Sequence, residues 1–451
     1  MNADPRLIGW LGIVRLGLVQ ASLGSIVVLT TSTLNRVMVV ELALPAILPG
    51  VLVALHYFVQ ISRPRFGHGS DLGGRRTPWI IGGMAVLGAG GVLAATATSL
   101  MATSQFLGTL LAVIAFLLIG MGVGASGTCL LVLLAAKVHP DRRAAAATIT
   151  WIMMIAGFAI TAGVVGSILD PFSFGRLIAI AASVALFALI TTSLALWGIE
   201  GTRAVPDTPP ESTAGDRRRQ FMEALRDVLN EPQTRRFGVF VFVSMLAYSA
   251  QDLVLEPFAG AVLGLTPGES TRLGGTQHGG VLVGMLLVAF LGSIPAFNSR
   301  LVLRVCMIVG CLSSGALLGA LALAGFVGAS WPIQTNVFAL GVANGAFAVA
   351  AIGSMMALVS QGHKNHDGTR MGVWGAAQAL AFGLGGILGT AAVDLTRMLT
   401  GSVPFAYAIV FIAQAFMFVL AAYLATQLTR RRAPALSTSL TRSLATEAGS
   451  T

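Results

Sequence analysis

RPRFGHGSDLGGRRTPW, residues 63–79, lies between two apolar segments that are each long enough to cross a lipid bilayer. The pattern G-x-x-x-D-x-x-G-R-R is formed here by Gly67, Asp71, Gly74, Arg75 and Arg76. Glycine permits a tight turn between close helix ends. The aspartate can cap the next helix or pair with an arginine, and the arginines hold the loop at cytoplasmic headgroups. This stretch predicts a short cytoplasmic loop between two membrane helices.

The composition is that of a protein whose surface faces lipid. Of the 451 residues, 55% are hydrophobic and only 10% are charged, whereas a soluble domain has about 25% charged residues. Gly is abundant, at 54 residues, as close packing of membrane helices requires. The net charge of +10 comes from short basic clusters between apolar segments. Such clusters set membrane orientation, so no nucleic-acid partner is expected.

Apolar segments of spanning length, about 20 residues each, recur along the chain. The expected spans are 9–32, 44–62, 79–99, 106–135, 145–168, 177–198, 237–262, 277–296, 301–325, 332–359, 371–393 and 403–427. The predicted organisation is an N-terminal six-helix half (1–198), a cytoplasmic linker (199–236), a C-terminal six-helix half (237–428) and a disordered cytoplasmic tail (429–451). Within the linker, the helical spacing of apolar residues in 216–230 predicts either an amphipathic helix on the membrane surface or a solvated connector helix.

The distribution of Lys and Arg predicts the orientation. If both termini lie on one side, that side holds 23 of the 28 Lys and Arg residues, and the other side holds Arg36, Arg176, Arg272 and Arg397. The positive-inside rule then places both termini in the cytoplasm. The three cysteines lie in apolar segments without a paired spacing, so neither a disulfide nor a cysteine-based metal site is expected.

Two halves of six helices, joined by a long cytoplasmic linker and carrying this loop pattern, resemble the major facilitator superfamily. The resemblance implies an all-α membrane fold of about 12 transmembrane helices. The corresponding loop of the second half, FNSRLVLR (297–304), keeps only the arginines. The internal symmetry is therefore visible in hydropathy rather than in the motif.

Four segments, from both halves, resemble the PucC/LhaA family, a branch of that superfamily. They are LNRVMVVELALPA (34–46), ALHYFVQISRPRFGHGSDLGGRRTPWI (54–80), AQDLVLEPFAG (250–260) and GVWGAAQALAFGLGG (372–386). The resemblance implies an assembly factor that delivers bacteriochlorophyll to antenna polypeptides, or chaperones them, in the intracytoplasmic photosynthetic membrane of a bacterium. Bacteriochlorophyll is then the implied cargo, and antenna polypeptides are the implied partners. Chlorophyll synthase, the protein-insertion machinery and the reaction-centre core are further candidate partners, and the client antenna is either the core or the peripheral one.

Charged residues at membrane depth are costly and usually face a cavity or a partner, so they are the first candidate site residues. Asp252 and Glu256 are four residues apart and share one helical face, which predicts a proton-coupling pair or a polar contact with a ligand or helix. The alternative is that Pro257 bends the helix and both acids reach headgroup water. Glu41, which Arg36 could neutralise, precedes the second span; its alternative is a charged loop.

His56 and Trp374 complete the candidates for contact with pigment or partner. His56 lies inside the second span, and neutral imidazole is a common metal ligand, so His56 is a candidate ligand of the pigment magnesium. The alternative is a histidine hydrogen-bonded between helices. Trp374 either lines a pigment site, belongs to an interfacial aromatic belt or fills space.

Enzyme signatures are missing from the sequence. There is no G-x-S-x-G elbow, no P-loop lysine motif and no zinc pattern. A membrane prenyltransferase such as a chlorophyll synthase would carry two Asp-rich motifs for diphosphate and magnesium, which Asp252 and Glu256 do not supply. The sequence therefore predicts a protein that is not an enzyme and has no metal site of its own. The alternative function is a proton-coupled secondary transporter of a tetrapyrrole or another small molecule.

Overall fold

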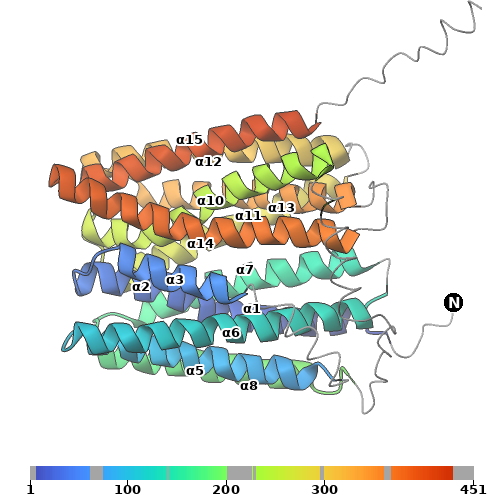
Figure 1. Ribbon diagram of the computed structural model, residues 1–451, viewed down its shortest axis with the longest axis horizontal. Helices are drawn as coiled ribbons and strands as arrows, with labels where there is room; N and C mark the ends of the chain where they lie inside the picture. Colours follow the sequence, from blue (N-terminus) through green and yellow to red (C-terminus); the bar gives the residue numbers. More distant parts are fainter. Residues whose placement is uncertain are drawn as a thin grey trace, which may run out of the picture.

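The computed structural model describes residues 7–60, 75–139, 142–200, 226, 230–294, 299–359 and 367–429. Within these ranges the chain is helical and contains no strand. The helices lie side by side in one bundle, with the two sequence halves forming its lower and upper parts in Figure 1.

The N-terminal half begins with one long helical element. This element consists of α1 (Trp10–Val28), the π-helical η1 (Leu29–Thr33), α2 (Leu34–Arg36) and the π-helical η2 (Val37–Glu41). The remaining helices of this half are α3 (Ile47–Val59), α5 (Thr77–Met101), α6 (Gln105–Lys137), α7 (Arg143–Ile168) and α8 (Phe174–Leu196). The second half holds α10 (Pro232–Ala261), α11 (Pro267–Ser293), α12 (Ser299–Val327), the 3₁₀ turn η5 (Gly328–Ser330), α13 (Ile333–Val359), α14 (Asp367–Thr400) and α15 (Val403–Thr429).

Eleven helices in the described part of the chain are long and apolar enough to cross a membrane. The first of them runs from Trp10 to Glu41 without interruption, and α3 adds a shorter apolar helix of 13 residues. Large apolar side chains such as Phe106, Phe187 and Trp197 are exposed on the outside of the bundle. An apolar exterior of this kind suits a lipid environment, and the chain is a multi-pass membrane protein.

The two halves meet mainly along two seams, where α3 packs against α14 and α7 against α11, and the end of the first helix also contacts α10. Small residues allow the close approach. At Gly166 of α7, a Cβ atom would lie 2.6 Å from the backbone nitrogen of Arg272 and 2.7 Å from the backbone oxygen of Gly268 in α11. Because both neighbours are backbone atoms, no side chain fits there, and the seam is a direct helix-to-helix contact.

Two helix boundaries differ most from the sequence-based expectation, and α14 also continues to Thr400 instead of ending near residue 393. The first helix continues to Glu41 instead of ending near residue 32, because Arg36 forms an ion pair with Glu41 and so neutralises the charges at its end. Helix α11 begins at Pro267 rather than near residue 277. A capping box explains this start: Glu269 N–H donates to Thr266 Oγ1 (3.1 Å) and Thr266 N–H donates to Glu269 Oε2 (2.9 Å).

Several predicted features fall wholly or partly on residues outside the ranges that the structure describes. The loop residues Gly67, Asp71 and Gly74 lie outside the described residues, as do the tail from 430 onward and all of the predicted 216–230 helix except Arg226 and Asn230, which are helical. Arg75 and Arg76 are described and directly precede α5.

Glu200, just beyond α8, caps the start of α5. Its two carboxylate oxygens accept hydrogen bonds from the backbone N–H groups of Arg76 (2.6 Å) and Thr77 (2.8 Å). Burial by itself raises the pKa of Glu200, but the hydrogen bonds from Thr77 and Arg76 and the charge of Arg76 outweigh it, so the pKa lies below its ordinary value of 4.5. The ionised carboxylate therefore ties the two helices together.

Glu200→Gln is expected to lower the thermal unfolding temperature at neutral pH but not at low pH. A carboxyl whose pKa is lowered by folding stabilises the protein above its unfolded pKa, and this stabilisation disappears as the pH falls through the folded pKa. The difference between wild type and variant should shrink as the pH drops below about 4.5. Unfolding curves in detergent across this pH range test the prediction, and a difference that does not change with pH would contradict it.

Candidate functional site

Three polar residues of the first helix form a face against α10. Ser32, Asn35 and Arg36 are three and four residues apart, so they share one side of the helix. Ser32 belongs to the π-helical segment η1, and the π-helical segment η2 begins directly after Arg36. Short π-helical insertions are frequent at functional sites, because they turn side chains away from the regular helical register. We call the contact between this face and α10 the polar seam.

Across the polar seam, side chains from one half bind groups from the other. Ser32 Oγ donates to Glu256 Oε1 (2.6 Å), and Asn35 Nδ2 donates to the backbone oxygen of Leu253 (2.6 Å). Glu256 is 2% exposed, so its carboxyl lies inside the protein and not in headgroup water. Glu256 Oε2 and Asn35 Oδ1 have no hydrogen-bond partner. Buried polar atoms without a partner are rare and costly, and they indicate where a water, a proton or a ligand group binds.

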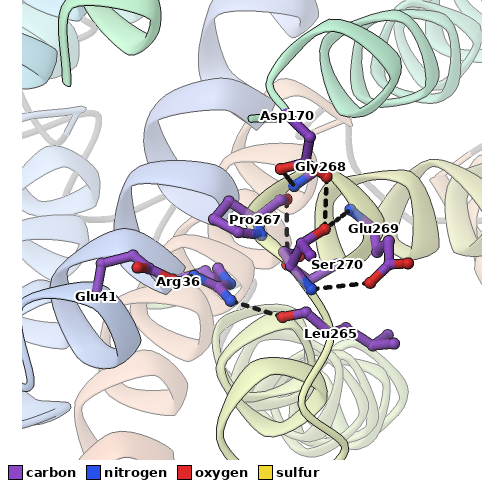
Figure 2. A network of polar contacts seen from close by, with 9 residues as sticks. Arg36, Glu41, Asp170, Leu265, Pro267, Gly268, Glu269 and Ser270 are labelled. Carbon is purple, nitrogen blue, oxygen red and sulfur yellow. Dashed lines mark hydrogen bonds and ion pairs between the residues drawn. The ribbon is translucent and has the colours of Figure 1, made fainter. Parts of the chain in front are cut away.

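Arg36 is the most deeply buried charge of the seam, at 1% exposure. Its guanidinium forms an ion pair with Glu41 and donates from Nη2 to the backbone oxygen of Leu265 (2.8 Å), as Figure 2 shows. Gly260 of α10 makes the room, since a Cβ atom there would lie 2.8 Å from Arg36 Nη2. Arg36 thus links the first helix to the segment between α10 and α11.

Asp252, the second acid of α10, lies one turn before Glu256 and is half-buried. Its Oδ1 accepts a hydrogen bond from Gln277 Nε2 of α11 (3.2 Å). Helix α10 runs on through Pro257 to Ala261, so both acids belong to the continuous helix. The two acids have different surroundings: Asp252 bonds within its own half, whereas Glu256 bonds across to the other half.

Two further carboxylates hold the halves together, and they do so reciprocally. Asp170, after α7, caps α11: its Oδ2 accepts from Thr266 Oγ1 (2.5 Å). Its Oδ1 accepts from Gly268 N–H (3.1 Å), as seen in Figure 2. Asp394, in α14, accepts from the backbone N–H groups of Ala46 (3.0 Å) and Ile47 (2.8 Å) at the start of α3. Each half therefore places a carboxylate on a helix N-terminus of the other half, where the backbone N–H groups and the helix dipole favour negative charge.

These bonds are concentrated at one end of the bundle. Among the described residues, every hydrogen bond between the halves joins residues 32–47 or 170 to residues 253–271 or 394. We call this the latched end. It is the end where α3, α11 and α15 begin and where the first helix and α10 finish.

His56 and Trp374 lie away from the polar seam. His56 is buried in α3, with its Nε2 3.0 Å from Gln60 Nε2 and its ring edge-to-face against Tyr57. Trp374 packs on Phe237, and its indole N–H donates to the backbone oxygen of Thr234 (3.1 Å) near the start of α10. At 1.5 Å per residue, Thr234 is about 30 Å along α10 from Glu256. The structure thus brings together Arg36, Glu41 and Glu256, and the roles of His56 and Trp374 stay predictions.

Sequence reasoning missed Ser32, Asn35, Asp170 and Asp394. Ser32 and Asn35 are common residues in membrane helices, and nothing in the sequence separates them from packing residues. Asp394 did leave a signal, because it is an acid inside an apolar segment, AAVDL (391–395). Within the described residues, no group of three His, Cys, Asp or Glu side chains could hold a metal ion.

Comparison with known proteins agrees with this architecture. The fold is similar to that of a solved peptide transporter, POT in complex with sulfate, with a TM-score of 0.66, 14% identity and coverage of 92% of this chain and 94% of the other. At this identity the likeness shows the fold alone, which is that of the major facilitator superfamily. The predicted all-α, two-half membrane fold is confirmed.

The sequence relatives identify the family. This chain is 52% identical over 432 residues, covering 95% of this chain and 97% of the relative, to the "Bacteriochlorophyll synthase 44.5 kDa chain" of Rhodobacter capsulatus. It is 29% identical over 401 residues, 86% of each chain, to "Protein PucC" of Rhodovulum sulfidophilum. The family model described as "PUCC protein" matches residues 33–433, a range that includes Asn35, Arg36 and Glu256 of the polar seam, both cross-half caps and most of both halves. The chain therefore belongs to the PucC family, as its four sequence segments predicted.

Proposed function

We propose that this chain is an assembly factor that delivers bacteriochlorophyll to antenna polypeptides, or chaperones them, in the photosynthetic membrane. The observation that carries the proposal is the family match over residues 33–433. The name of a relative that is 52% identical over nearly its whole length links that relative to bacteriochlorophyll. Pigment and single antenna helices are apolar, so a bundle with an apolar exterior suits contact with them inside the bilayer.

The latched end supports a particular direction of approach. By the positive-inside rule this end is periplasmic, because the basic loops lie at the other end. Eight hydrogen bonds between the described parts of the two halves hold it closed. Clients then approach from the bilayer or from the cytoplasmic side, where antenna polypeptides and pigment are made.

Deletion of the gene from the native phototroph distinguishes an assembly factor from an enzyme of pigment biosynthesis. An assembly factor leaves bacteriochlorophyll synthesis intact, so mature pigment is still made while antenna absorbance falls. A biosynthetic enzyme, as the word "synthase" in the relative's name would suggest, leaves unfinished pigment precursors and little mature pigment. Pigment extracts and whole-cell spectra distinguish the two results. Accumulated precursor without mature pigment would overturn the proposal.

A proton-coupled transporter is the second candidate function, and one observation favours it. Glu256 is buried between the two halves, bonds to Ser32 and keeps one oxygen without a partner. In a transporter that works by alternating access, protonation of such a carboxyl would weaken the hydrogen bond between Ser32 and Glu256 that joins the halves. The proposed assembly role needs the contact but not its titration.

Glu256→Gln is therefore expected to preserve antenna assembly. The amide oxygen of Gln still accepts the hydrogen bond from Ser32, so antenna absorbance should stay within about twofold of wild type, the change expected from a weakened hydrogen bond. Glu256→Leu removes the acceptor and serves as the matched control with a larger loss. Complementation of the deletion strain provides the measurement. Loss of function in Glu256→Gln together with loss of proton-driven tetrapyrrole uptake in vesicles would favour the transporter.

A further inference from the structure

A narrow apolar groove runs between α5 and α6 on the outside of the N-terminal half, away from the polar seam. Its volume is about 300 Å³, and its lining includes Pro78, Trp79, Gly82, Val86, Met121 and Gly122. Trp79, Val86 and Met121 are exposed and form its walls. From Pro78 to Val86 the groove extends about 12 Å along α5 at the helical rise per residue.

The groove exists because the two helices touch backbone to backbone beneath it. At Gly83, a Cβ atom would lie 2.7 Å from the backbone nitrogen of Ser126. At Gly82, one residue away, a Cβ atom would meet nothing within 4 Å. Gly83 therefore sets the helix spacing, whereas Gly82 opens the floor of the groove to the surroundings. A side chain placed at Gly82 would fill the groove without changing the helix contact.

We propose that this groove binds one acyl chain of an anionic phospholipid, with the phosphate held at Arg75. The shape fits a single flexible hydrocarbon chain: the groove is apolar, open to the lipid side and only about two helical turns long. A helix of a partner protein, about 10 Å wide, would rest on the raised walls instead of entering.

The charge at one end of the groove selects the headgroup. Arg75 is exposed and lies three residues before Pro78, at the start of α5. Glu200 is 6% exposed and accepts from the N–H groups of Arg76 and Thr77, and no acid among the described residues forms an ion pair with Arg75. Trp79 lies beside this charge, where tryptophan commonly lies at the headgroup level. Basic residues at the edge of a groove between membrane helices are a recognised binding arrangement for anionic lipid headgroups.

Trp79 is also the reporter for the test. The purified full chain is reconstituted in vesicles of phosphatidylcholine and phosphatidylglycerol in which one of the two lipids is brominated on its acyl chains. Bromine quenches tryptophan on contact, and subtraction of a Trp79→Phe variant isolates the signal of this residue. We expect brominated phosphatidylglycerol to quench Trp79 at about fivefold lower mole fraction than brominated phosphatidylcholine, the factor expected from one arginine near an anionic headgroup.

Two variants and one control decide the result. Arg75→Gln should remove the preference for phosphatidylglycerol, and Gly82→Phe should reduce quenching by both lipids because the new ring occupies the groove. Gly375→Phe, on the exposed side of α14 where a Cβ atom also meets nothing within 4 Å, should leave both values unchanged. Equal quenching by the two lipids in wild type, an unchanged preference in Arg75→Gln, or undiminished quenching in Gly82→Phe would overturn the proposal. So would displacement of the brominated lipid by added bacteriochlorophyll, since the pigment would then be the occupant.

Discussion

Arg36→Leu is expected to lower the folding stability by about 2 to 3 kcal/mol and to abolish most of the assembly activity. Arg36 is fully buried between the halves, and its removal leaves Glu41 without its ion-pair partner and the Leu265 carbonyl without a donor. Loss of one partner from a buried pair costs more than the pair itself contributes. The expected loss lies at or below the lower end of the about 3 to 5 kcal/mol that breaking a fully buried pair costs, because the Glu41 side chain is 32% exposed and can be hydrated.

Two companion variants separate the charge of Arg36 from its geometry. Arg36→Lys keeps the positive charge but cannot reach two acceptors with a planar group, so about half of the stability loss is expected. Gly260→Ala removes no polar group, yet its Cβ atom would lie 2.8 Å from Arg36 Nη2 and displace the guanidinium. Thermal unfolding in detergent and antenna absorbance in the complemented strain are the two readouts. A fully stable Arg36→Leu protein would show that the ion pair does not hold this end.

Asp170→Ala combined with Asp394→Ala is expected to open the latched end without unfolding either half. Each carboxylate caps a helix of the opposite half through two hydrogen bonds, and loss of such a cap costs about 1 kcal/mol. The two caps lie on different seams and share no partner, so the effects should add to about 2 kcal/mol, or about a 30-fold shift of the closed-to-open equilibrium. Each half has its own hydrophobic core, which keeps it folded.

A cysteine at Thr271 reports this opening. Thr271 is 1% exposed in the contact between the halves, so Thr271→Cys should react slowly with a bulky polar maleimide. In a background with Cys306→Ser, the single cap variants should increase the labelling rate about fivefold and the double variant about 30-fold. Cys129 and Cys311 are buried and serve as internal controls for global unfolding. If the double variant is labelled no faster than either single variant, the caps do not act independently.

The arrangement of helices could be predicted because it depends on local sequence. A membrane helix must satisfy its own backbone hydrogen bonds, so its length and apolar composition are visible in any window of about 20 residues. The start of α11 was missed because GESTRLGGTQH (268–278) is polar. In the structure, polar groups of this segment form hydrogen bonds with residues distant in sequence: Gln277 donates to Asp252, and Gly268 N–H donates to Asp170.

The candidate site could be predicted only in part for the same reason. Arg36 and Glu41 are close in sequence, so their pairing was visible. Ser32 and Glu256 are 224 residues apart, and their contact depends on how the two halves pack. Glu256 was identified because an acid at membrane depth is conspicuous, whereas its partner Ser32 was not. His56 and Trp374 were chosen for their chemical type and, for His56, its place inside a membrane span, and the fold places both away from the polar seam.

The most direct test of the assembly role is to purify this chain from the native phototroph in mild detergent. An absorption spectrum and identification of the co-eluting chains then decide the question. If the chain is an assembly factor, bacteriochlorophyll absorbance and antenna or reaction-centre polypeptides appear in the same fraction, and both are reduced in Arg36→Leu. A colourless protein that elutes without these partners would contradict the assembly role and favour transport of a small molecule.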